Sequence, residues 1–115
     1  MWIMISGPYT AGGADASGRA RNLAAMNAVA LQIFQRGHVP VIGVNLALPV
    51  IEAARASLGD DAFEAIMMPL SLALAERCDA CLRIGGPSDG ADAEAARFRA
   101  RGLSVYTRIE DIPAG

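Results

Sequence analysis

The chain has 115 residues, a formal charge of −2 and 53% hydrophobic residues, which predicts one domain, residues 1–115, with a buried core. It contains no lysine, so ten arginines and one histidine are its only basic side chains. The absence of lysine excludes Schiff-base chemistry and the phosphate-binding lysine of P-loop proteins and kinases. No basic stripe is present, and we expect no nucleic-acid polymer as a partner.

The cysteines, the histidine and the apolar stretches exclude further classes. Cys78 and Cys81 cannot form a disulfide framework and fit a reducing compartment, and their position at a strand start favours inert packing over redox chemistry. A lone His38 excludes most zinc sites, and a Ser-His-Asp triad unless His38 itself serves, so we expect no metal and no cofactor. Residues 39–51 are too short to cross a bilayer, and residues 1–5 lack the basic region of a secretory signal. We expect a soluble cytoplasmic protein that does not bind membranes.

The first third of the chain predicts a strand, a long helix and a second strand. Residues 2–5 are a short apolar run followed by the glycine-rich loop 6–13. Ser17 is a candidate N-cap for a helix with apolar residues at helical spacing, which Gly37 ends. Residues 39–44 are the second predicted strand.

Two helices are predicted in the middle of the chain. Pro49 is expected to open the first helix, and Gly59 to end it. Asp60 or Asp61 is expected to cap the second. Pro69 lies inside that second pattern and should break or kink the helix.

The last third predicts two strands around one helix. Residues 79–84 are the third strand, Ser88 is the N-cap of a helix that continues to Arg101, and residues 103–106 are the fourth strand. Strands separated by helices of this length favour a parallel sheet. We therefore predict an α/β fold, a flavodoxin-like three-layer sandwich with a parallel sheet of four or five strands.

Ligands of such sheets bind beyond the carboxyl ends of the strands. The loop before the last helix lies there and is the first candidate binding region. Ser88 as N-cap leaves backbone N–H groups at Gly90 and Ala91 that suit an anion. Glu94 lies one turn later and covers these two small residues, which leaves room for a ligand. From the spacing alone, a surface glutamate on an ordinary capped helix is the commoner interpretation.

The loop after the first strand is the second candidate region. Ser6, Gly7, Pro8 and Tyr9 form a backbone-rich cradle with a phenol, although a plain connection between strand and helix has the same appearance. Gly13 occupies the position of a P-loop lysine, and no G-x-G-x-x-G pattern is present. P-loop and dinucleotide-binding functions are therefore not supported.

The order of these motifs resembles that of the nucleoside 2-deoxyribosyltransferase-like superfamily. The chain looks most similar to small members of unknown function, and it is also similar to 2'-deoxynucleoside 5'-phosphate N-hydrolases. The resemblance spans nearly the whole chain. It is carried by Ile5-Ser6-Gly7-Pro8, Asn22, a helix ending at Gly37, Cys78-Asp79 and the element Ser88-x-Gly90-x-x-x-Glu94.

The resemblance implies cleavage of an N-glycosidic bond in a nucleoside or nucleotide, within a homo-oligomer. Glu94 would attack the anomeric carbon and form a glycosyl-enzyme ester, which water (in a hydrolase) or a second base (in a transferase) would resolve. Tyr9 would orient Glu94, and Ser6, Gly7 and Pro8 would cradle the ribose and base. The alternative is a non-catalytic module that binds a nucleotide or sugar phosphate in the same cleft.

One position departs from the pattern of that family, which carries an aspartate on the helix before the third strand. The matching residue is Ser71, which cannot act as a general acid near neutral pH. Either Asp79 or Asp92 then takes over the leaving-group role, or the glycosidic activity is weak or lost.

The same loops also bear on the recognition of a phosphate group. Members of the family that act on nucleotides often have serine six residues before the catalytic glutamate, as Ser88 is here. Ser88, Gly90 and a contact from Arg19 would together favour a 5'-monophosphate. Asp89 and Asp92, beside the same helix start, would oppose it.

Overall fold

The structure, a computed structural model, describes all 115 residues and has the predicted α/β architecture. Its sheet has four strands, all parallel, in the order β2-β1-β3-β4, as in flavodoxin-like three-layer folds. The order reverses between β1 and β3, so the loops that follow these two strands diverge to opposite faces and leave a crevice between them. The strands are β1 (Trp2–Ser6), β2 (Val39–Val41), β3 (Ala80–Arg83) and β4 (Val105–Tyr106).

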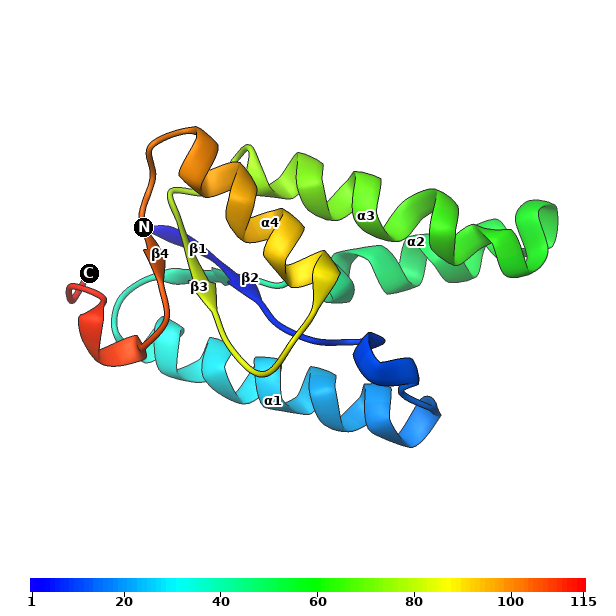
Figure 1. Cartoon of the computed structure of the whole chain (residues 1–115), viewed down its shortest axis with the longest axis horizontal. Coiled ribbons are helices and arrows are strands. Elements are labelled where there is room, and N and C mark those ends of the chain that lie inside the picture. Colours follow the sequence, from blue (N-terminus) through cyan, green and yellow to red (C-terminus); the bar gives the residue numbers. More distant parts are fainter.

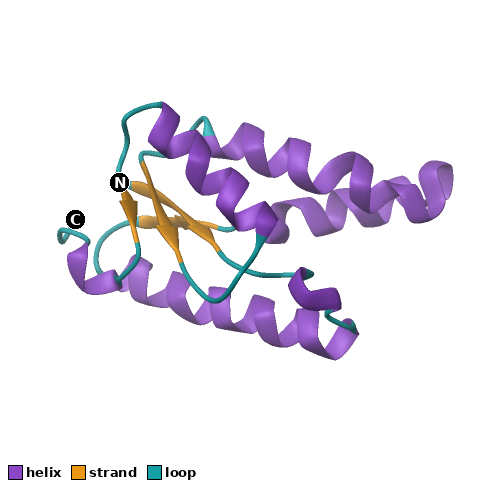
Figure 2. Ribbon diagram, in the orientation of Figure 1, coloured by secondary structure: helices purple, strands orange, loops and turns teal.

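Helices cover both faces of this sheet (Figures 1 and 2). In Figure 1, α1 lies along one face, α4 lies along the other, and the α2–α3 pair extends past the edge of the sheet. None of the helices is both long enough and apolar enough to cross a membrane. The helices are α1 (Ala16–Gln35), α2 (Gly43–Leu58), α3 (Ala62–Ala75) and α4 (Asp89–Ala100), with short 3-10 turns at Ala11–Gly13, Gly59–Asp61 and Ile109–Asp111.

The alternation of side chains along β1 divides the core between the two faces. Ile3 and Ile5 pack with residues of α1, including Met26. Met4 points the other way and packs with Phe98 of α4. Because successive side chains in a strand point to opposite faces, Ser6, which follows Ile5, is directed toward α4 as Met4 is.

The second predicted strand is shorter than expected, because α2 begins at Gly43. Residues 39–44 form an apolar run, and a short run of this kind fits a strand and a buried helix equally well. Val44, Ala47 and Ile51 recur at helical spacing and are all buried. Their burial places this stretch in a helix that starts well before Pro49.

Pro49 and Pro69 both lie inside helices, so the prediction that Pro49 opens a helix was wrong, and of the break or kink predicted at Pro69 the break does not occur. A proline in a helix interior costs about 3 kcal/mol, since it removes a hydrogen bond and crowds the preceding turn. Close packing of α2 on α3 offsets this cost. Gly43 permits the approach, because a β-carbon at this position would overlap the hydroxyl of Ser71.

The N-cap predicted for the last helix is confirmed, and the N-cap predicted for the first helix is not. Ser88 is the N-cap of α4, and its Oγ accepts a hydrogen bond from the Ala91 N–H at 3.1 Å. At α1 the cap is Asp15 instead of Ser17, because the Asp15 carboxylate accepts from the Gly18 N–H at 2.8 Å. An aspartate and a serine are equally good caps, so composition alone could not separate them.

Candidate functional site

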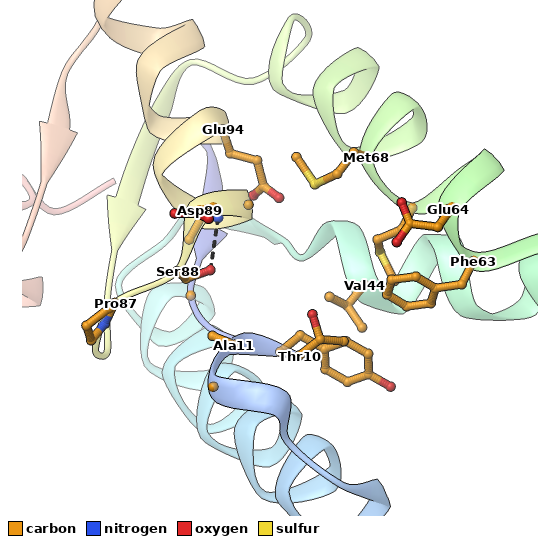
Figure 3. A pocket seen from close by; sticks show the side chains of 16 residues that line it. Thr10, Ala11, Val44, Phe63, Glu64, Met68, Pro87, Ser88, Asp89 and Glu94 are labelled. Atoms are coloured by element: carbon orange, nitrogen blue, oxygen red, sulfur yellow. Dashed lines mark hydrogen bonds between the residues drawn. The ribbon is translucent and has the colours of Figure 1, made fainter.

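A cleft of about 460 Å³ opens at the carboxyl ends of β1 and β3, at the predicted edge of the sheet. The loop after β1 forms one wall, the start of α4 a second, and α3 a third (Figure 3). Its position is the crevice in which doubly wound folds bind ligands. Of the predicted site residues, the cleft brings together Gly7, Tyr9, Ser88, Gly90 and Glu94.

Glu94 belongs to the inward-facing stripe of α4. Ala91 and Phe98 lie three and four residues from it along the helix, Ala95 follows it directly, and all three are buried. Glu94 is half-buried as a consequence, and its carboxyl group reaches the cleft. The prediction that Glu94 covers the small residues at the helix start is consistent with this geometry.

Ser6 holds the Glu94 carboxyl group from behind the cleft. Its side chain is 1% exposed, and its Oγ donates a hydrogen bond to Glu94 Oε1 at 2.7 Å. The Cys81 thiol donates to the same Ser6 Oγ at 3.5 Å, so the hydroxyl hydrogen is free to point at the carboxylate. Ser6 therefore positions Glu94 and does not itself line the cleft.

Burial raises the pKa of Glu94 to about 7, while the Ser6 hydrogen bond and the nearby Arg83 guanidinium act in the opposite direction. Desolvation disfavours the charged carboxylate, and the two neighbouring donors compensate for only part of that effect. Near neutral pH the group exists in both forms. The carboxylate form is a nucleophile and the protonated form is an acid.

Two glycines allow close contacts around the cleft. One lies between α4 and α3, and the other lies between the loops that follow β1 and β3. Gly90 faces α3, since a β-carbon on it would lie 3.3 Å from the Met68 sulfur. Gly85 has a φ of 76°, and a β-carbon there would lie 2.7 Å from Pro8 Cδ. Pro8 thus fixes the loop after β1 against the loop after β3. Pro8 is not among the residues that line the cleft, which corrects its prediction as a binding residue.

Tyr9 lines the cleft but does not hold Glu94. Its ring stacks on Phe63, with ring centroids 6.5 Å apart and planes 16° apart. The hydrogen bond to the Glu94 carboxyl group comes from Ser6 instead. The predicted role of Tyr9 as the orienting partner is therefore corrected, and the Tyr9–Phe63 pair forms an aromatic wall.

Neither Asp79 nor Arg19 lines the cleft, so the structure does not bring these two predicted residues to the site. Asp79 precedes β3, and its carboxylate accepts a hydrogen bond from the Trp2 N–H at 2.7 Å, at the opposite edge of the sheet. Arg19 donates to the Ala14 carbonyl at 2.8 Å and does not line the cleft. The cation expected for a 5'-phosphate is thus not supplied by Arg19.

Asp92, the other candidate for the leaving-group role, and Ser71, which matches the family aspartate, also lie outside the cleft. Asp92 is exposed and pairs with Arg83 at 3.0 Å. Ser71 is 1% exposed, lies against Gly43 in the α2–α3 interface, and its hydroxyl has no hydrogen-bond partner. Neither side chain lines the cleft.

The α3 wall and Asp89 were not predicted as parts of the site. Glu64, Met67 and Met68 share one face of α3 and line the cleft together with Phe63. Their i, i+3, i+4 spacing was visible in the sequence, but it did not show that this face meets a cleft and not the core. In Figure 3, Glu64 and Glu94 approach the cleft from opposite helices.

Both cysteines are buried and free. Burial raises the pKa of Cys78, and it raises that of Cys81 to about 11. Thiols with raised pKa values stay protonated and unreactive, in agreement with the packing interpretation.

No model of a known protein family matches the chain, and no curated protein sequence matches it.

Proposed function

We propose that the protein cleaves the N-glycosidic bond of a nucleoside or nucleoside 5'-monophosphate, with Glu94 as the nucleophile. The observation that supports this most directly is the Glu94 carboxyl group, held by a buried serine hydroxyl inside a cleft of about 460 Å³. Pockets for small ligands fall in this size range and combine apolar walls with a few oriented polar groups.

The geometry suits attack by one carboxylate oxygen. Ser6 binds Oε1 of Glu94, which leaves Oε2 for the anomeric carbon. As the new C–O bond forms, the C–N bond breaks and its electron pair passes to the base. Water then hydrolyses the glycosyl ester: its hydroxyl goes to the sugar, its remaining proton goes to the released base, and Glu94 is again a carboxylate. A second base in place of water would make the protein a transferase.

The walls of the cleft offer the contacts that such a substrate needs. The Tyr9–Phe63 pair presents aromatic surface against which a base can stack. Ser88 and Gly90 place a hydroxyl and backbone groups on the side of Glu94, within reach of a sugar. Gly7 closes the cleft from the loop after β1.

The test is release of free base from a panel of nucleosides and 5'-nucleotides by wild type and by Glu94→Gln. We expect the substitution to lower turnover by roughly a thousandfold or more, because it removes the nucleophile and keeps the side-chain shape. Glu52→Gln is the matched control, since Glu52 is an exposed residue that pairs only with Arg55. Mass spectrometry of quenched wild-type reactions should find a glycosyl group on Glu94.

Two results would contradict the proposal. Near-wild-type turnover by Glu94→Gln would exclude the covalent mechanism. Nucleotide binding without any base release by the wild type would instead support a non-catalytic binding module.

A further inference from the structure

The carboxylic acids that line the cleft have no basic side chain among them. Glu64, Asp89 and Glu94 line it from two helices, and no arginine or histidine does. Arg83, the last residue of β3, lowers the pKa of Glu94, but it does not line the cleft and donates to the Asp92 carboxylate and the Gly86 carbonyl. The cleft therefore carries three acidic groups without a basic partner inside it.

The aromatic wall lies beside these acids. Phe63 and Glu64 are consecutive on α3, and both face the cleft from that helix (Figure 3). Tyr9 stacks on Phe63 in a nearly parallel arrangement. The face of an aromatic ring attracts a cation, and the nearby carboxylates add to that attraction, the half-buried Glu94 more than the exposed Glu64 and Asp89.

We propose that the preferred substrate is a nucleoside whose base carries a positive charge, such as a pyridinium or N-alkylated purine nucleoside. This inference rests on the proposed function and specifies its substrate. The acidic lining and the Tyr9–Phe63 wall would bind the charged base, while Glu94 lies near the sugar.

The chemistry of the leaving group favours the same class. A neutral base departs as an anion unless an acid protonates it. A cationic base departs neutral, because the electron pair of the broken C–N bond cancels the charge on its ring nitrogen. Neither Asp79 nor Asp92 lines the cleft to supply a proton, and a cationic base does not require one. The positive charge also favours the ionised, nucleophilic form of Glu94.

The first experiment compares kcat/KM for nicotinamide riboside and 7-methylguanosine with that for inosine and guanosine. We expect the cationic pair to react at least about tenfold faster, and added salt to reduce this preference. Glu64→Gln should lower the ratio of cationic to neutral kcat/KM several-fold, and Glu52→Gln should leave that ratio unchanged. Equal or faster cleavage of the neutral nucleosides would overturn this inference but leave the proposed function intact.

The second experiment measures binding without turnover, so that it does not depend on catalysis. Calorimetry with Glu94→Gln compares nicotinamide riboside with benzamide riboside, its uncharged isostere with a C–C glycosidic bond. We expect the cation to bind several-fold more tightly, because Glu64 and Asp89 remain. Equal affinities, or no binding of either compound, would overturn the inference. Absence of base release from every nucleoside, with the cation still preferred in binding, would overturn only the proposed catalysis.

Discussion

At the scale of single residues, burial raises the pKa of Glu94 and the Ser6 hydrogen bond counteracts part of that rise. The wild-type kcat/KM should rise with pH and level off above about pH 7, because the nucleophile must lose its proton. The Ser6 hydrogen bond lowers the Glu94 pKa, so Ser6→Ala should move this rise to higher pH. A hydrogen bond to a charged group contributes about 1.5–3 kcal/mol, and we expect kcat/KM near neutral pH to fall about tenfold or more.

The measurement is the pH profile of kcat/KM for both proteins. Much of the lost activity of Ser6→Ala should return at high pH, which a merely destabilised variant would not show. Ser57→Ala is a suitable control, since Ser57 is an exposed residue of α2 that bonds only to the Ala54 carbonyl. Superimposable profiles for Ser6→Ala and wild type would show that the hydroxyl does not control ionisation.

At the scale of elements, the α2–α3 interface contains one unpaired polar group, the hydroxyl of Ser71. A buried hydroxyl without a partner costs about 1–3 kcal/mol, so Ser71→Ala should leave stability unchanged or raise it by about 1 kcal/mol. Base release should not change, because Ser71 does not line the cleft. Urea unfolding and the base-release assay test these two expectations. Loss of activity at full stability would mean that Ser71 acts in the reaction.

The same interface shows where prediction of elements from the sequence reached its limit. Local patterns predicted four strands, the cap at Ser88 and the helix end at Gly59, because each depends on neighbours in the chain. The predictions at Pro49 and Pro69 failed because packing between α2 and α3 offsets the free-energy cost of a proline inside a helix, and no local pattern reveals that packing. Glu64 was missed for a related reason, since the orientation of α3 decides whether that face meets solvent, core or cleft.

At the scale of the whole molecule, strand–helix alternation was sufficient to predict the parallel sheet and the edge at which the cleft lies. It also brought Ser6, Gly7, Ser88 and Glu94 to that edge, because each ends or follows a strand or lies in the first two turns of the next helix or at its cap. Asp79 precedes its strand, and the same rule places it at the opposite edge. The pairing of Ser6 with Glu94 depended on the tertiary fold, since these residues are far apart in the chain and meet only through the sheet.

Glu94 also couples the stability of the whole molecule to pH. Burial raises its pKa in the folded protein from the ordinary 4.5 to about 7, so the folded state keeps a proton that the unfolded state has already lost in this range. The stabilising contribution is full below about pH 4.5, decreases as pH rises, and is absent above about pH 7. Glu94→Gln cannot ionise and should lack this dependence. It should exceed the wild type in free energy of unfolding by on the order of 3 kcal/mol at about pH 8, and match it at about pH 4. Urea unfolding at both pH values measures the two differences, with Glu52→Gln as the exposed control. A difference between Glu94→Gln and wild type that is the same at both pH values would show that Glu94 ionises in the folded protein as it does in the unfolded chain.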